Sequence, residues 1–270
     1  MFKKQKTPLV KKLWQFAIKN WFLGVFFACI AFVGVVSVYR LFVKKPHFVY
    51  AKVKISQGLW WASSQKPPVW FLNVLKKGDE ERDFAGEATS RILNVRYYPY
   101  YASSQYDIYL DLKLKVSSEL KSGNVNFARS PLAVGTAVDF TFPQTEFSAT
   151  VIEISATPFT NKRVWKTVTL VKNNAQPWEA AALKVGDTYF DGTEKVLEIL
   201  NVQTQNTLNP EVYPAYIDPL QIVTVTAKIK GQLRGADFLF GEEQIVRAGQ
   251  PFIAATQSYY FADFKVAAIQ

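Results

Sequence analysis

A long apolar stretch near the N-terminus limits what this chain can fold into more than any other feature. Residues 21–39 contain no charged side chain. The stretch Trp21–Val43 is long enough to cross a bilayer, because a transmembrane helix needs about 20 mostly apolar residues. Only residues 1–20 precede it, whereas more than two hundred residues follow it. The sequence therefore predicts a single transmembrane helix over 21–43 that anchors one large folded portion in the lipid bilayer.

Basic residues lie on both sides of this stretch, but mainly before it. Residues 1–20 carry six lysines and no acid, whereas only Arg40, Lys44 and Lys45 close the stretch. The positive-inside bias predicts that 1–20 form a cytoplasmic arm and that the large portion is extracytoplasmic. A cleaved signal peptide is the alternative, but its apolar region is about 7 to 15 residues long and ends in a small-residue cleavage site. Because this stretch is longer and lacks such a site, we predict an uncleaved signal-anchor in the cell membrane.

The basic arm has two interpretations. It sets the topology alone, or it also binds anionic lipid head groups, because each lysine near a membrane surface contributes about 1 kcal/mol of attraction. The lysines that would make this second contact are Lys3, Lys4, Lys6, Lys11 and Lys12.

The net charge of +10 does not belong to the folded portion. Residues 1–47 hold nine of the 32 Lys and Arg and none of the 22 acids, which leaves 23 bases against 22 acids, or +1. A nucleic-acid-binding face needs an excess of bases, so we expect no nucleic-acid partner. Cys29 lies in the apolar stretch and His47 is the only histidine, which argues against metal sites built on several imidazoles and against Cys-His catalysis in the folded portion. We predict no metal, no cofactor and no catalytic residue.

The folded portion contains an internal repeat. Residues 70–79 (WFLNVLKKGD) return as 178–187 (WEAAALKVGD), and ILNV occurs at both 92–95 and 199–202. Residues 110–115 (LDLKLK) then match 225–230 (VTAKIK). Because these blocks recur in the same order, we predict two tandem domains with one strand order, copy 1 (48–156) and copy 2 (163–270). The short segment between them predicts that the copies pack together with little freedom.

Each copy has the pattern of a small β-domain. Apolar and polar residues alternate through 108–116, as in a half-buried strand, and the segments 136–142 and 148–155 read as a hairpin. Before them, a proline opens one short helix whose Trp and Leu (Trp70 and Leu75, Trp178 and Leu183) we expect on the buried side, and Gly78 or Gly186 ends the turn in a left-handed conformation. The fold class is mainly β: two tandem, repeat-related sandwich-like or barrel-like domains, each with one short helix.

Tyrosine-rich loops are the candidate binding surface. They occupy equivalent connections in the two copies and combine tyrosine with proline. Tyrosine offers flat amphipathic contact area at low entropy cost, which suits a peptide or a sugar face, whereas packing at the end of a β-domain is the alternative. The residues are Tyr97, Tyr98, Tyr100 and Tyr101 in copy 1 and Tyr213 and Tyr216 in copy 2.

The end of copy 1 resembles a known bacterial family. Residues 134–142 (VGTAVDFTF), followed by 147–154 (FSATVIEI), are similar to the closing pattern of the family of domain of unknown function 4330. The resemblance extends over about residues 21–156, and it implies a single-span protein with an outer β-rich domain, here duplicated. It implies no activity and no site residues. The absence of an N-x-S/T sequon also favours a bacterial source.

These features lead to two hypotheses of function. The first is a membrane-anchored envelope protein without enzymatic activity, which acts as a scaffold or protein-interaction module with a protein partner in the envelope. The alternative is a polysaccharide- or peptide-binding module that uses the tyrosine loops. An enzyme such as a glycosidase would need a pair of acids in a recognisable setting, and the sequence offers none.

Overall fold

The computed structural model describes residues 21–43, 47–55, 66–100, 102–118, 125–128, 130–160, 162–207 and 220–270. The basic arm 1–20, with its lysines, lies outside the described residues. The chain divides into two compact units, Met1–Pro46 and His47–Gln270.

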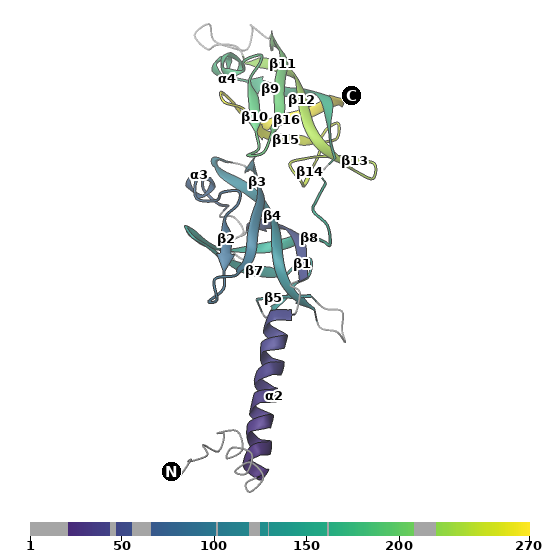
Figure 1. Ribbon diagram of the computed structural model, residues 1–270. Helices are drawn as coiled ribbons and strands as arrows, with labels where there is room; N and C mark the ends of the chain where they lie inside the picture. Colours follow the sequence, from purple (N-terminus) through teal and green to yellow (C-terminus); the bar gives the residue numbers. More distant parts are fainter. Residues whose placement is uncertain are drawn as a thin grey trace, which may run out of the picture. The chain divides into compact units, whose positions relative to one another are not determined.

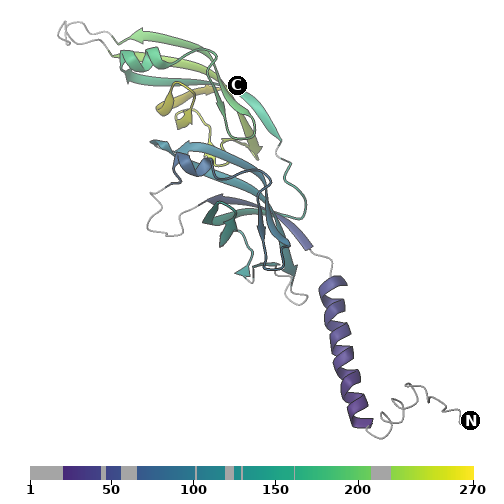
Figure 2. The same cartoon turned by 60° about the vertical axis from the view of Figure 1, so that its left-hand side comes forward.

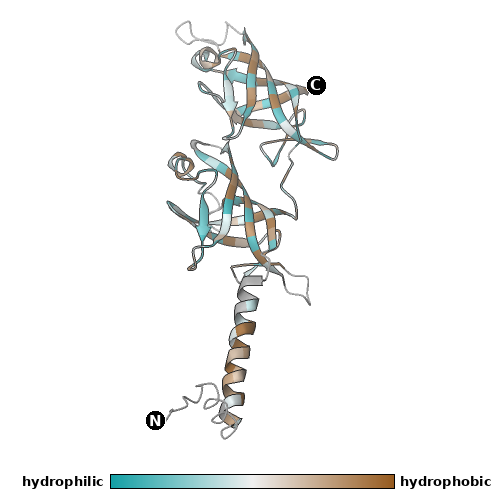
Figure 3. Cartoon of the chain, viewed as in Figure 1, coloured by the Kyte–Doolittle hydropathy of each residue, from teal (hydrophilic) through white to brown (hydrophobic). Residues whose placement is uncertain are grey.

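The apolar stretch forms a helix, α2, over Trp21–Val43. Its residues are mainly apolar along its length (Figure 3), and large side chains such as Trp21, Phe22 and Phe32 are exposed. Among the residues that the structure describes, however, no helix combines the length and the apolar content that crossing a membrane requires. The helix itself matches the predicted range, whereas its placement in a membrane stays a prediction.

The unit His47–Gln270 begins with an antiparallel sheet of the copy 1 segment (Figure 1). Its main strands are β1 (His47–Ile55), β2 (Glu80–Arg82), β3 (Ala88–Tyr100), β4 (Ala102–Ser118), β7 (Ala137–Phe142) and β8 (Thr145–Ser155). They are ordered β2-β3-β4-β1-β8-β7, and the short strands β5 (Val125–Phe127) and β6 (Ser130–Pro131) extend from β4. Every pairing is antiparallel, as expected where successive strands are joined by hairpins and short loops.

The copy 2 segment forms a second antiparallel sheet. Its main strands are β9 (Arg163–Ala175), β10 (Thr188–Phe190), β11 (Lys195–Asn206), β12 (Gln221–Arg234), β15 (Pro251–Ala255) and β16 (Tyr260–Ile269). They are ordered β10-β11-β12-β9-β16-β15, with β13 (Asp237–Phe240) and β14 (Gln244–Ile245) extending from β12. This is the strand order of the first sheet, so the predicted equivalence of the two strand orders is confirmed.

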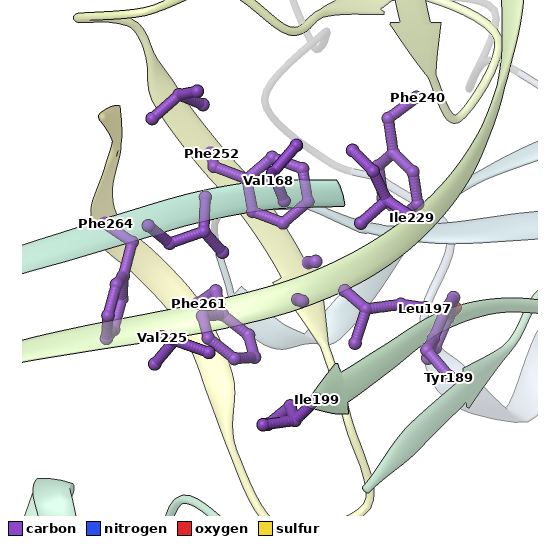
Figure 4. Packing of buried hydrophobic residues seen from close by; sticks show 14 of the residues in the cluster. Val168, Tyr189, Leu197, Ile199, Val225, Ile229, Phe240, Phe252, Phe261 and Phe264 are labelled. Carbon is purple, nitrogen blue, oxygen red and sulfur yellow. The ribbon is translucent and has the colours of Figure 1, made fainter. Parts of the chain in front are cut away.

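Both sheets are strongly curled, and each encloses its own apolar core (Figure 2). The alternation that predicts half-buried strands is visible along β7, where exposed and buried residues follow one another. In copy 2, aromatic rings and branched side chains from several strands pack together (Figure 4), among them Phe252 of β15 and Phe261 and Phe264 of β16. The mainly β prediction is confirmed at the level of two curled sheets.

Each copy carries one short helix, α3 (Val69–Leu72) or α4 (Pro177–Ala182). The prediction that Trp faces the core is wrong, because Trp70 is 62% exposed and Trp178 is 68% exposed. Helices this short present only one side to a sheet. In α3 that side carries Phe71, which packs edge-on against Phe147 at 5.9 Å between ring centroids.

The remaining features of the repeated block are as predicted. Leu75 and Leu183 are buried. Gly78 has a φ of +97° and Gly186 a φ of +91°, so both turns need the left-handed conformation that glycine adopts without strain.

Candidate functional site

Tyr98 is near the end of β3 and lies between the two sheets. It is 6% exposed, its hydroxyl donates to Asp191 Oδ2 at 2.8 Å, and its ring meets Phe240 at 5.7 Å between centroids. Both partners belong to copy 2. Burial, with the charge of Asp191, raises the pKa of Tyr98 well above its ordinary value, so the hydroxyl keeps the proton that it donates. Tyr98 is therefore packed between the copies.

The neighbouring tyrosines also contact copy 2. The amide of Tyr97 donates to the carbonyl oxygen of Asp191 at 2.9 Å, and the hydroxyl of Tyr189 donates to the carbonyl oxygen of Tyr97 at 2.9 Å. Tyr100 is half-buried, and the hydroxyl of Tyr260 donates to its carbonyl oxygen at 2.5 Å. The β3–β4 hairpin thus docks on copy 2 by its backbone as well as its rings. Tyr101, Tyr213 and Tyr216 lie outside the described residues.

Charged side chains meet on the outward face of the first sheet. Lys52 of β1 stands directly opposite Asp111 of β4 in the strand register. Arg96 of β3 donates to both carboxylate oxygens of Asp111, at 2.5 and 2.7 Å. The three side chains are buried even though they point away from the core of copy 1. On this face Lys52 and Arg96 contact Glu242 of copy 2, and Lys52 also lies over the ring of Phe159.

Copy 2 supplies the complementary charges. Glu242, in the turn between β13 and β14, accepts from Arg96 Nε at 2.8 Å and from Lys52 Nζ at 3.0 Å. Arg163, at the start of β9, donates to Glu242 Oε1 at 3.0 Å and to Asp191 Oδ2 at 2.6 Å. We refer to Lys52, Arg96, Asp111, Arg163, Asp191 and Glu242 as the ion cluster.

The ion cluster contains three cations and three anions, and two partly exposed acids, Glu153 and Glu194, also pair with Lys52 and Arg163, each at 3.4 Å. Burial alone would raise the pKa of Glu242, but the charges of Arg96, Lys52 and Arg163 lower it below its ordinary value. Burial would likewise raise the pKa of Asp191, and the hydrogen bond from Arg163 with the amides of Glu194 and Thr193 lowers it. Among the described residues, no buried side-chain polar atom lacks a hydrogen-bond partner. Such a fully paired cluster fixes the orientation of the groups that it joins.

Next to the ion cluster, a cavity of about 390 Å³ opens between the copies. Its walls are mainly aromatic and apolar, with two acids and two amide side chains. We call it the junction groove, and it is lined by Tyr98, Pro99, Tyr100, Asp107, Tyr109, Phe240, Gly241, Glu243, Gln244, Ile245, Gln250, Pro251 and Ile253. Volumes of about 300 to 1,000 Å³ with mostly apolar walls and a few polar groups are typical of ligand sites.

The acids at 79–83 have local structural roles. Glu80 forms ion pairs with Arg82 and Arg91, both at 2.6 Å. Asp83 accepts from the amides of Ala85 and Glu87, and so holds its own turn. In the part of the chain that the structure describes, no group of three or more His, Cys, Asp or Glu side chains is placed to hold a metal ion.

Sequence reasoning missed the ion cluster. Alternation along β4 places Asp111 on the outward face, where a charged residue is expected to meet water. A signal existed in the comparison of the two copies. The paired positions Lys52 and Asp111 correspond through the repeat to Thr169 and Thr226, which face each other in copy 2. The charged pair of copy 1 therefore distinguishes its outward face, which contacts the second domain, from the corresponding face of copy 2.

Comparison with known proteins gives no relative from which a role could be transferred, since no family model, no curated protein and no solved structure matches the chain.

Proposed function

We propose that the protein is a membrane-anchored, extracytoplasmic envelope protein without enzymatic activity, whose two β-domains act as a scaffold or protein-interaction module. The anchor rests on the uncharged run 21–39 and on the lysines that precede it. The resemblance to the family of domain of unknown function 4330 agrees with a single anchor and an outer β-rich part.

The observation that carries the proposal is the ion cluster. Its pairs Lys52–Glu242 and Arg96–Glu242 join the two copies. Removing one partner of such a buried pair leaves an uncompensated charge and costs about 3 to 5 kcal/mol while the copies stay packed. Two domains held in one orientation present a fixed surface, which lowers the entropy cost of binding a partner.

The acids of the cluster also fit a structural role. A general acid needs a raised pKa, so that it holds a proton at neutral pH. The pKa values of Glu242 and Asp191 are instead lowered, and both carboxylates accept hydrogen bonds from cations of the cluster. We therefore assign the carboxylates of Glu242 and Asp191 to the contact between the copies.

Site-specific photo-crosslinking in native membranes tests the proposal. The full chain carries the crosslinking residue at an exposed position, Trp70 or Trp178, and a matched control carries it at the buried Phe252. We expect one envelope protein to be crosslinked from an exposed position and not from Phe252. Turnover of an envelope polymer by the purified chain, with no crosslinked protein from either exposed position, would contradict the proposal.

The junction groove favours a second candidate function, a polysaccharide- or peptide-binding module. Tyr98, Tyr100 and Tyr109 line the groove, although only part of the predicted tyrosine surface takes part. Binding of purified envelope polysaccharide to the full chain, lost on Tyr100→Ser, would favour this candidate over the scaffold.

A further inference from the structure

The repeated blocks 70–79 and 178–187 share five identical residues: a tryptophan, a leucine, a lysine, a glycine and an aspartate. Three of the five serve the fold. The leucine is buried and the glycine gives its turn a positive φ. The aspartate carboxylate accepts a hydrogen bond, from the Lys76 amide in copy 1 and from Ser258 in copy 2. The tryptophan and the lysine are the two shared residues that still need an explanation.

The two tryptophans occupy the second position of α3 and α4, and most of each ring is exposed to solvent. The contact made by the next residue differs between the copies. After Trp70, Phe71 packs on the ring of Phe147, whereas after Trp178, Glu179 forms an ion pair with a lysine. The same exposed ring therefore stands beside two different kinds of packing, so packing on the sheet does not account for its presence in both copies.

The shared lysines, Lys76 and Lys184, are also exposed. No salt bridge among the described residues includes either ammonium group, whereas Lys172, for example, pairs with Glu179 at 2.7 Å. Each block thus presents to solvent one indole ring and one ammonium group that no carboxylate of the described chain holds. An ammonium group of this kind is available to an anionic group of a ligand.

The two blocks lie on the same side of the folded unit. Figures 1 and 2 show α3 and α4 on one side of the two sheets in both views. A ligand that offers the same group more than once can bind both blocks together, and its second contact is then intramolecular, which raises the affinity. A polymer of repeated units meets this requirement.

The chemistry of the blocks favours a sugar polymer over a peptide. Neither block contains a strand, so neither offers the backbone edge on which an extended peptide adds. An indole ring gives a flat, rigid, amphipathic surface at low entropy cost, which suits the apolar face of a sugar ring. The neighbouring ammonium group selects a sugar that carries a carboxylate or phosphate group.

We propose that the two blocks are equivalent binding sites for one anionic polysaccharide, with Trp70 and Lys76 in copy 1 and Trp178 and Lys184 in copy 2. Each indole stacks on a sugar unit, and each ammonium group pairs with an anionic group of the polymer. These residues do not line the junction groove. The inference goes beyond the proposed function, because it adds a polymer ligand to a protein-interaction module.

The test measures binding of the full chain, in mild detergent, to alginate, polygalacturonate and a teichoic acid by biolayer interferometry. Neutral dextran lacks the anionic groups, and poly-L-glutamate lacks the sugar rings. We expect at least one of the three anionic polysaccharides to bind, and both control polymers to bind about tenfold or more weakly.

Single substitutions test the two-site arrangement. Trp70→Ala and Trp178→Ala each leave one site intact, so each should weaken binding of the long polymer about a hundredfold. A disaccharide of the same polymer reaches only one site at a time, so its affinity for the remaining site should stay unchanged. Trp165→Ala is the matched control, because this partly exposed tryptophan lies outside both blocks and its ring already faces Lys230 Nζ at 5.8 Å.

Binding of none of the three polysaccharides, or equal binding by the native chain and the double tryptophan variant, overturns the proposal. If a tryptophan variant melts at a lower temperature, the double variant Lys76→Gln, Lys184→Gln decides, since both side chains are exposed. Unchanged affinity of this lysine variant rejects the sites. A protein crosslinked from Trp70 or Trp178 in a chain that binds no polysaccharide would reject this inference and leave the proposed function intact.

Discussion

Glu242 shows how a single residue decides the relation between the two copies. It has a φ of +69°, a conformation that costs a non-glycine residue about 1 to 3 kcal/mol, and its carboxylate is buried. Both costs are offset because Lys52, Arg96 and Arg163 all donate to this one carboxylate. Glu243 follows it in the chain but is half-exposed, and its carboxylate pairs with Lys54 at 2.6 Å.

Glu242→Gln should therefore destabilise the folded unit strongly. The amide keeps the shape of the side chain but leaves three buried cations facing two anions, an imbalance that costs about 3 to 5 kcal/mol. Glu243→Gln is the matched control, because its side chain is 51% exposed and an exposed ion pair contributes at most about 1 kcal/mol. Thermal melts of the two variants measure the difference, and equal melting temperatures would show that the ion cluster does not hold the copies together.

The lowered pKa values of Glu242 and Asp191 predict how the stability of the folded unit depends on pH. Their folded-state pKa values lie below the ordinary values of 4.5 for Glu242 and 3.8 for Asp191. The stability that they contribute is fully present above these ordinary values and is lost as the pH falls through the lowered ones. The melting temperature of the native chain should fall on acidification below about pH 4.5, and Glu242→Gln should show a weaker fall. A variant with the native pH profile would exclude Glu242 as the titrating group.

At the scale of the element, the segments of the two short helices contain one residue that packs in the core and one that faces solvent. α3 and α4 occupy the same place in the two copies, and in both the tryptophan faces solvent while the leucine after the helix enters the core. In α4 the helix start is held by a capping box, with the amide of Gln176 donating to Glu179 at 2.8 Å. The tryptophans are thus not required to hold either helix on its sheet.

Substitution of the leucines should destabilise the protein much more than substitution of the tryptophans. Leu75→Ala and Leu183→Ala each remove a buried side chain, and we expect a loss of about 2 to 5 kcal/mol. Trp70→Ala and Trp178→Ala remove mostly exposed rings, so each should cost about 1 kcal/mol or less. Chemical denaturation of the four variants measures this contrast. A tryptophan variant as unstable as its leucine counterpart would show that the ring packs in solution.

At the scale of the whole molecule, the chain divides into the unit Met1–Pro46, which contains helix α2, and the unit His47–Gln270, which contains both sheets. The folded unit is close to neutral, and the basic residues are concentrated before and just after the apolar helix. The prediction of a signal-anchor topology rests on this separation of charge.

The orientation follows as a testable expectation. Protease added to intact cells or spheroplasts should remove 48–270, while a tag placed before residue 1 stays protected, because the positive-inside bias keeps the lysines in the cytoplasm. The control is the same tag placed after residue 270, which the protease should remove. Release of a mature soluble form into the medium would contradict the signal-anchor.

The sequence by itself determined the two β-sheets, their common strand order and their turn glycines, because these depend on local alternation and on conformations such as that of Gly78, and both copies repeat the same local signals. Only the tertiary structure decided which outward residues are buried. Asp111 and Tyr109 alternate with core residues, yet both are inaccessible because copy 2 covers their face. The contact of Lys52 with Glu242 joins residues 190 positions apart, and no periodicity within one strand records what packs on its other side.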